Sequence, residues 1–251
     1  MKDLNKVAGI TFLFWIMKII ATTLGETLGD FLSMTLNLGY ATGILITLTF
    51  FLIVLAIQLS RKKYFPVWYW LVIIATTTLG TEISDFLDRS LHLGYTWGSL
   101  LLFAGLLLTL FAWQKKFNNL KVYPIFEHNK EIYYWVAILF SNSLGTAFGD
   151  YLSDVVGLSY LNGAMVTAAV IAVVVGLHFF TKINEIVLFW IAFIFTRPFG
   201  ATFGDFLTKP LSKGGLDLGT LPASLVSIVL MGILIWFSHR KMNRQITEES
   251  L

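Results

Sequence analysis

Long apolar segments alternate with short polar segments along most of the chain. The first apolar segment covers about residues 7–36 and the second covers residues 41–59, with a short turn between them. At a rise of ~1.5 Å per residue, α-helices of this length cross a hydrocarbon core of ~30 Å. The pattern therefore predicts two membrane-spanning helices joined as a hairpin.

The hairpin pattern recurs, so that four copies fill the chain. The predicted repeats cover about residues 7–63, 64–117, 131–183 and 184–240, and a polar linker at residues 117–131 joins the second repeat to the third. Because each repeat has an even number of spans, all repeats enter the membrane in the same direction. We therefore expect a single transmembrane domain over residues 1–251, an all-α integral membrane protein with eight transmembrane helices in four parallel two-helix repeats.

A short motif lies in the first helix of each repeat: glycine, any three residues, glycine or serine, aspartate and an aromatic residue. The motif aspartates, which are 55, 65 and 55 residues apart, are Asp30, Asp85, Asp150 and Asp205. A tryptophan stands fifteen residues before each aspartate, at Trp15, Trp70, Trp135 and Trp190. The repeating unit is therefore a whole helix, and the spacing predicts two pseudo-symmetric halves offset by 120 residues.

With these motifs, the chain resembles a bacterial membrane-protein family built from four tandem repeats, each with two membrane spans and a characteristic tryptophan. That family is known as a repeat family of unknown function. The resemblance covers nearly the whole chain and implies the fold and the topology. It implies no substrate, so the function has to be inferred from the residues.

The composition agrees with a membrane protein. Hydrophobic residues make up 56% of the chain, charged residues 13%, and the mean hydropathy is +0.74, which is outside the range of ordinary soluble domains. The absence of cysteine excludes disulfides, thiolate metal sites and cysteine nucleophiles. The sequence also contains no HExxH motif and no arrangement of histidine with serine that is typical of hydrolases, so we do not expect an enzyme.

Basic residues gather at the ends of the apolar segments. Thirteen Lys and Arg residues, Lys2 among them, fall on the side of the two termini, whereas Arg89, Lys209 and Lys213 fall in the opposite turns. By the positive-inside rule we expect both termini in the cytoplasm of a bacterium, a multi-pass inner-membrane protein, and the lipid bilayer as its main partner. This distribution also explains the net charge of +3, so we expect no nucleic acid as a partner.

The small residues of the motif lie one turn apart on one helix face. Such faces allow two helix backbones to approach closely in a membrane. We therefore expect helix packing at Gly25, Gly29, Gly80, Ser84, Gly145, Gly149, Gly200 and Gly204.

The aspartates lie within predicted spans, where an ionisable side chain costs about 2.5 to 3.5 kcal/mol to insert. One explanation is structural: each aspartate caps a helix that the preceding glycine weakens. The other is functional: carboxylates of several repeats converge on a polar path. Polar residues one to two turns earlier on the same helices would line that path at Thr22, Thr77, Asn142 and Arg197.

The first half of the chain is the more acidic. Glu26 lies on the helix face of Asp30, and Glu82 lies close before the second motif aspartate. The six acidic residues of the spans, against Lys18 and Arg197, give a formal charge of −4 when all are ionised. This surplus favours a cation or a proton as the transported species.

Oxygen ligands suit hard ions such as Mg²⁺, Mn²⁺ or Ca²⁺. The expected metal ligands are Asp30, Asp85, Glu26 and Glu82. Asp150 and Asp205, with Arg197, would form a weaker counterpart. Apart from such a bound cation, we expect no cofactor.

These features predict a membrane transporter for a hard divalent cation, with proton coupling as an option. A cation channel and a structural or partner-binding membrane protein are the alternatives, and an intramembrane enzyme is the least expected. Glutamates in only two repeats and a single Arg197 argue against a symmetric pore.

Overall fold

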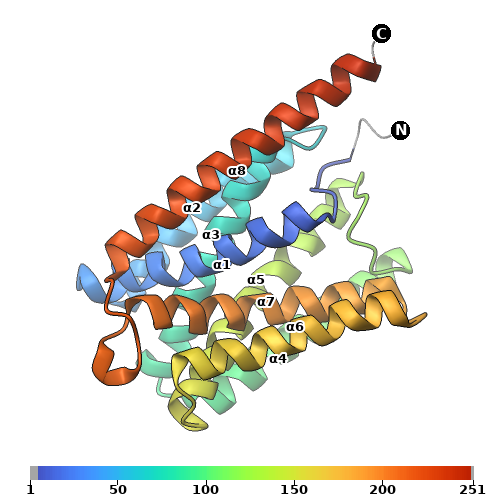
Figure 1. The fold of residues 1–251 in the computed structure, drawn as a ribbon. Helices are drawn as coiled ribbons and strands as arrows, with labels where there is room; N and C mark the ends of the chain where they lie inside the picture. The colour runs from blue at the N-terminus through green and yellow to red at the C-terminus, as the bar shows by residue number, and fades with distance from the viewer. Residues whose placement is uncertain (1–4, 250–251) are drawn as a thin grey trace.

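The computed structural model describes residues 5–249, without the side chains of residue 241 and residues 243–249; Lys2 lies outside the described residues. In this range the chain is all-helical, with eight α-helices, as predicted (Figure 1). The helices are α1 Phe12–Asp30, α2 Tyr40–Ser60, α3 Pro66–Asp85, α4 Gly94–Phe117, α5 His128–Asp150, α6 Tyr160–Phe180, α7 Glu185–Thr208 and α8 Thr220–Glu249.

Local sequence signals explain where several helices begin. The hydroxyl of Thr11 accepts a hydrogen bond from the backbone N–H of Phe14 at the start of α1, and the side chain of Asn184 does the same at the start of α7. Pro66 occupies the first turn of α3, where its missing N–H costs nothing. The tight turns within the first three repeats contain a residue with positive φ at Asn37, His92 and Gly157.

Seven of the eight helices are long and apolar enough to cross a membrane. Among the described helices, α5 does not meet this requirement, because Lys130 and Glu131 lie in its first turn and Ser141, Asn142 and Ser143 in its middle. The chain is therefore a multi-pass membrane protein by helix length and composition, with seven candidate spans instead of the eight expected.

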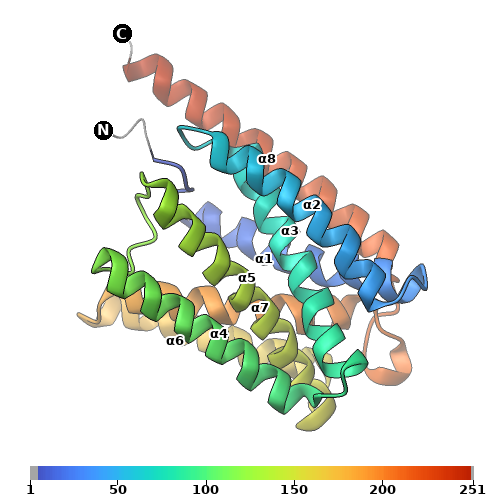
Figure 2. The ribbon, with the colours of Figure 1, turned by 180° about the vertical axis from the view of Figure 1, so that it is seen from behind.

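The odd-numbered helices form a closed inner ring. Each packs against the next, α1 on α3, α3 on α5 and α5 on α7, and α7 packs on α1. Each even-numbered helix packs outside this ring against the inner helix of the following repeat, so that α2 covers α3, α4 covers α5 and α6 covers α7 (Figures 1 and 2). The last helix, α8, covers α1 and completes the circle.

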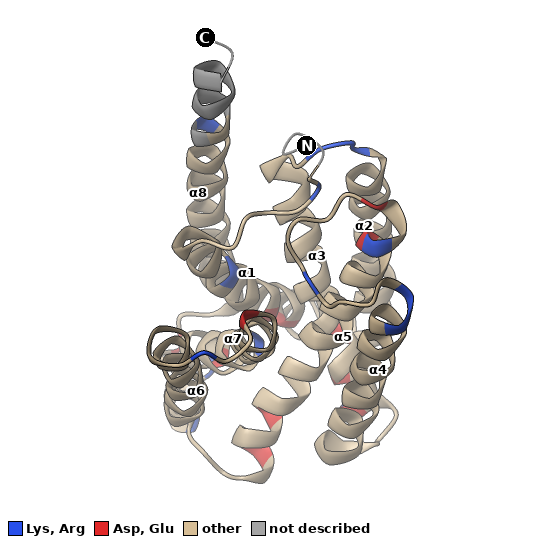
Figure 3. Ribbon diagram, turned by 90° about the vertical axis from the view of Figure 1, so that its right-hand side faces the viewer, with Lys and Arg blue, Asp and Glu red and all other residues tan. Residues whose placement is uncertain are grey.

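The outer helices carry the apolar surface. Only 22% of the most apolar stretch is buried in each of α2, α4, α6 and α8, against 61% or 72% in the inner spans α1, α3 and α7. α2 and α6 contain no Lys, Arg, Asp or Glu, and charged residues instead follow the inner helices and the helix ends (Figure 3). Side chains that contact lipid tails have to be apolar, and the exposed side chains of the outer helices meet this requirement.

Aromatic residues close the ring near the first turns of the inner helices. Phe14, Tyr69, Tyr134 and Phe189 share one repeat position, and the motif tryptophans follow directly. The hydroxyls of Tyr69 and Tyr134 lie 2.5 Å apart, and the ring of Phe14 contacts those of Trp70 and Phe189. This end of the ring is therefore filled by packed side chains.

Candidate functional site

The motif glycines bring the inner helices into close contact. A Cβ at Gly25 would lie 2.8 Å from the backbone carbon of Thr77, and one at Gly200 would lie 2.8 Å from that of Thr22. Both distances are shorter than real Cβ contacts allow. Each first glycine faces the polar residue of the next repeat around the ring, in the pairs Gly25 and Thr77, Gly80 and Asn142, Gly145 and Arg197, and Gly200 and Thr22.

The second small residues repeat this arrangement one turn further along. Gly29 faces Thr81, Gly149 faces Ala201, and Gly204 faces Glu26. Ser84 holds the same position in the second repeat and is fully buried. These close approaches place the polar residues of all four inner helices around a common axis.

The four motif aspartates are between 2% and 5% exposed. Within the described residues, the side chains of Asp30, Asp85 and Asp150 make no capping hydrogen bond at the helix junctions that follow them. In the first three repeats the α-helix runs through the aspartate and then widens into one turn of π-helix, at Phe31–Thr35, Phe86–Ser90 and Tyr151–Val155. The capping explanation is therefore wrong for these three aspartates.

Two basic residues lie between the aspartates. Arg89 Nη2 is 3.0 Å from Asp150 and its Nη1 is 3.6 Å from Asp85. Lys209 Nζ is 2.5 Å from Asp30 and 3.2 Å from Asp205. Each basic residue thus joins the aspartates of two neighbouring repeats.

The expectation that Arg89 and Lys209 belong only to the outer turns missed this role. A signal was present in the sequence: each lies four residues after a motif aspartate, and the two are 120 residues apart, so they hold the same position in the two halves. With them, the six acidic residues face four basic ones, and the formal interior charge is −2, not −4. The acidic surplus is smaller than the sequence predicted.

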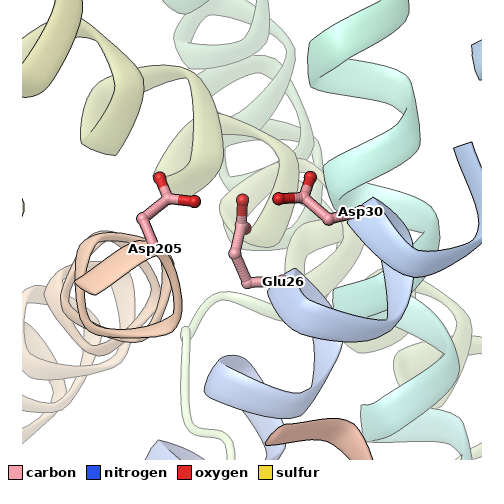
Figure 4. A group of neighbouring side chains, drawn as sticks. All are labelled: Glu26, Asp30 and Asp205. Atoms are coloured by element: carbon pink, nitrogen blue, oxygen red, sulfur yellow. The ribbon is translucent and has the colours of Figure 1, made fainter. Parts of the chain in front are cut away.

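Three carboxylates from two helices come together next to Lys209. Glu26 and Asp30 from α1 and Asp205 from α7 each offer an oxygen within 4.8 Å of the others, and their carboxylates face one another (Figure 4). Asp85 was also expected as a ligand here, but it lies beside Arg89 instead. The set combines the first and last repeats, which are neighbours only because the ring closes.

Glu82, also expected in the metal site, lies against an outer helix. Its carboxylate packs where a side chain on Gly43 of α2 would be. Neither carboxylate oxygen of Glu82 has a hydrogen-bond partner of proper geometry among the described residues. Glu82 is fully buried and does not belong to the cluster of Glu26, Asp30 and Asp205.

Arg197 extends from α7 to its neighbour α1 and to α3 on the opposite side of the ring. Its Nη2 donates to Glu26 Oε2 at 2.9 Å and to Thr81 Oγ1 at 2.6 Å, and the residue is fully buried. Arg197 thus forms an interior ion pair with Glu26, whereas the sequence had grouped it with Asp150 and Asp205. Lys18 lies in the same interior, where its Nζ donates to Asn142 Oδ1 at 3.0 Å.

A cavity of about 290 Å³ leads to the aspartates from the side of the hairpin turns. Asp150, Asp205, Arg89 and Lys209 line it, together with Asp154 and Tyr160. Burial alone lowers the pKa of Lys209, but the charges of Asp205 and Asp30 outweigh burial and raise that pKa above its ordinary value. Lys209 is therefore an ammonium ion in the lining of this cavity.

Taken together, these features define a multi-pass membrane protein of four two-helix repeats with a charged interior. The repeats match the family described as Repeat of Unknown Function (DUF347) at residues 13–64, 68–116, 133–184 and 188–243, and the chain belongs to this family. No curated protein and no solved structure matches the chain.

Proposed function

We propose that this protein is a transporter that moves a small hard cation across a bacterial inner membrane, with Glu26, Asp30 and Asp205 as its cation site. The observation that carries the proposal is that these three buried carboxylates converge within 4.8 Å inside membrane-spanning helices. Carboxylates at such depth are costly unless they bind something, and membrane proteins use them for ion and proton pathways.

The spacing of the oxygens suits a hard cation. Oxygen ligands lie about 2.0 to 2.6 Å from Mg²⁺ or Ca²⁺, so two ligands on opposite sides of the ion are roughly 4 to 5 Å apart. The three carboxylate oxygens lie no further apart than that, within 4.8 Å of one another. A cation would compete with protons for the same oxygens, which supplies a physical basis for proton coupling.

The closed end of the ring favours a transporter over an open channel. The cavity reaches Asp150 and Asp205 from the turn side, but Arg197 and the aromatic layer of Tyr69 and Tyr134 fill the ring beyond them. A site that opens to one side and is closed to the other is what alternating access requires. In this proposal all eight helices cross the bilayer and both termini are cytoplasmic, as the distribution of basic residues favours.

The test is cation uptake into proteoliposomes that contain the purified full-length protein. Asp30→Asn and Asp205→Asn keep size and remove charge, so we expect each to reduce Mn²⁺ uptake at least tenfold. The control is Asp217→Asn, because Asp217 is an exposed carboxylate in the turn between α7 and α8. We expect this control to transport at the wild-type rate.

Unchanged uptake in the Asp30→Asn, Asp205→Asn double variant would overturn the proposed cation site. A loss of uptake counts in its favour only when the variant keeps the wild-type thermal unfolding profile in detergent.

A further inference from the structure

The position of Lys209 suggests what occupies the proposed cation site before a metal ion binds. Resting on the proposed function, we infer that the Lys209 ammonium is a tethered cation that holds the site between Asp30 and Asp205 until a divalent cation displaces it. This cationic group of the chain itself lies between two members of the acidic cluster.

The ammonium of Lys209 makes few hydrogen bonds in this site. Its Nζ makes one hydrogen bond to a carboxylate, with Asp30 Oδ2 at 2.5 Å, and a weak one to the sulfur of Met34 at 3.9 Å. Asp205 Oδ1, although 3.2 Å from Nζ, has no hydrogen bond of proper geometry among the described residues. A buried carboxylate oxygen therefore points into the site with its bonding capacity unused.

The equivalent residue of the other half is held differently. Arg89 donates to Asp150, to the hydroxyl of Tyr40 at 3.0 Å and to the hydroxyl of Tyr95 at 3.3 Å. The planar guanidinium is thus fixed by three partners from three helices. No third carboxylate joins Asp85 and Asp150 among the described residues, whereas Glu26 joins the aspartates around Lys209. Within the described part of the chain, only the junction of the first and last repeats combines a third carboxylate with a cation that makes a single hydrogen bond to a carboxylate.

Lys209 also has room to leave. It follows directly after the end of α7, its side chain is 21% exposed, and it lines the cavity on the turn side. Its four-carbon stem can carry the ammonium from the carboxylates into that cavity without moving a helix. Arg89 lines the same cavity and its side chain is 29% exposed, but its hydrogen bonds to Asp150, Tyr40 and Tyr95 hold the guanidinium in place.

Charge decides which cation gains by the exchange. Glu26, Asp30 and Asp205, with Arg197 paired to Glu26, leave a formal charge of −2, and Lys209 reduces it to −1. A monovalent ion in place of the ammonium leaves the charge unchanged, whereas a divalent ion brings it to zero. A low-dielectric interior favours the neutral arrangement strongly, so a divalent cation is the ion that the site favours in place of the Lys209 ammonium.

Calorimetric titration of the purified full-length protein in detergent tests this inference, with Mn²⁺ and Na⁺ as the probes. In Lys209→Gln the competing charge is gone, so we expect Mn²⁺ to bind at least tenfold more tightly, with Mn²⁺ still preferred over Na⁺. Lys213→Gln is the matched control, because Lys213 is an exposed cation that lines the same cavity. Arg89→Gln, at the equivalent position, should not tighten Mn²⁺ binding.

Equal Mn²⁺ affinity in wild type and Lys209→Gln would overturn the tethered-cation inference and leave the transport proposal standing. Equal tightening in Lys213→Gln would also overturn it, because a general change in surface charge would then explain the result. Wild-type Mn²⁺ affinity in Asp30→Asn, or no Mn²⁺ binding by any of these proteins, would overturn the proposed cation site itself.

Discussion

Single buried charges in this protein find their partners on other repeats. Arg197 of α7 pairs with Glu26 of α1, and Lys209, which follows α7, pairs with Asp30 of α1. Arg89, in the turn after α3, pairs with Asp150 of α5. A charge removed from water needs such a partner, because its desolvation penalty is several kcal/mol. Not every buried charge has an ion-pair partner among the residues described: Lys18 donates to the amide oxygen of Asn142, and the two carboxylate oxygens of Glu82 have no hydrogen-bond partner.

The contrast between the two glutamates leads to a prediction about stability. Glu26→Gln removes the only carboxylate that pairs with Arg197 in the described structure, so we expect the free energy of unfolding to fall by about 3 to 5 kcal/mol. Glu82→Gln replaces a buried carboxylate that lacks partners with a neutral amide of the same shape, so we expect unchanged or increased stability. Thermal unfolding followed by tryptophan fluorescence measures both variants.

Equal destabilisation by the two substitutions would contradict this prediction. It would mean that Glu82 has a charged partner whose contribution matches that of Arg197.

At the scale of helices, the glycine faces set the distance between the inner helices and therefore the position of every polar side chain. Gly25 and Gly200 leave no space for even one methyl group against Thr77 and Thr22. Three of the inner helices then widen into a π-helical turn directly after the aspartate. Such turns are frequent at functional sites, and here they occur at the level of the buried charges.

The glycine contacts predict opposite effects for the same substitution at two places. Gly25→Ala would force α1 and α3 apart, so we expect a loss of about 1 to 3 kcal/mol in the free energy of unfolding. Gly232→Ala lies on α8 with nothing within 4 Å of the added Cβ, and alanine favours a helix over glycine by about 1 kcal/mol. Unfolding temperatures in detergent should therefore fall for the first variant and stay constant or rise for the second. Equal unfolding temperatures would show that the helices approach less closely than described.

At the scale of the whole molecule, the chain closes on itself. The last helix, α8, packs on the first, and the hydroxyls of Ser224 and Thr27 lie 2.9 Å apart across that contact. Every inner helix is therefore covered by an outer helix from the preceding repeat, and α1 is covered by α8 of the last repeat. The closed ring also leaves the termini at one end and the turn between α7 and α8 at the other (Figure 1).

The two ends of the molecule can be assigned to the two sides of the membrane by labelling. The chain contains no cysteine, so single cysteines introduced at Leu38, Leu93, Lys62 and Lys116 report without background. We expect a membrane-impermeant thiol reagent to modify positions 38 and 93 in intact cells, and positions 62 and 116 only after permeabilisation. The reverse pattern would show that the termini lie outside the cell.

The sequence by itself determined the repeats, the helices and the faces of the inner helices. Hydrophobic segment length predicts hairpins, an even number of spans predicts parallel repeats, and the glycine spacing predicts close helix contacts at Gly25 and its equivalents. These properties are local, since they depend on residues within one helix or one hairpin. The positions of the buried aspartates on one side of the inner helices follow from the same local pattern.

Only the tertiary structure decided which charges meet. The sequence grouped Glu26 and Asp30 with Asp85 because they share the acidic half, but the closed ring makes α7 as near a neighbour of α1 as α3 is. Asp205 therefore joins the first repeat across a separation of 175 residues from Asp30, and Lys209 lies between them. Partner choice at a repeat junction depends on how the last repeat returns to the first, and no pattern within a single repeat contains that information.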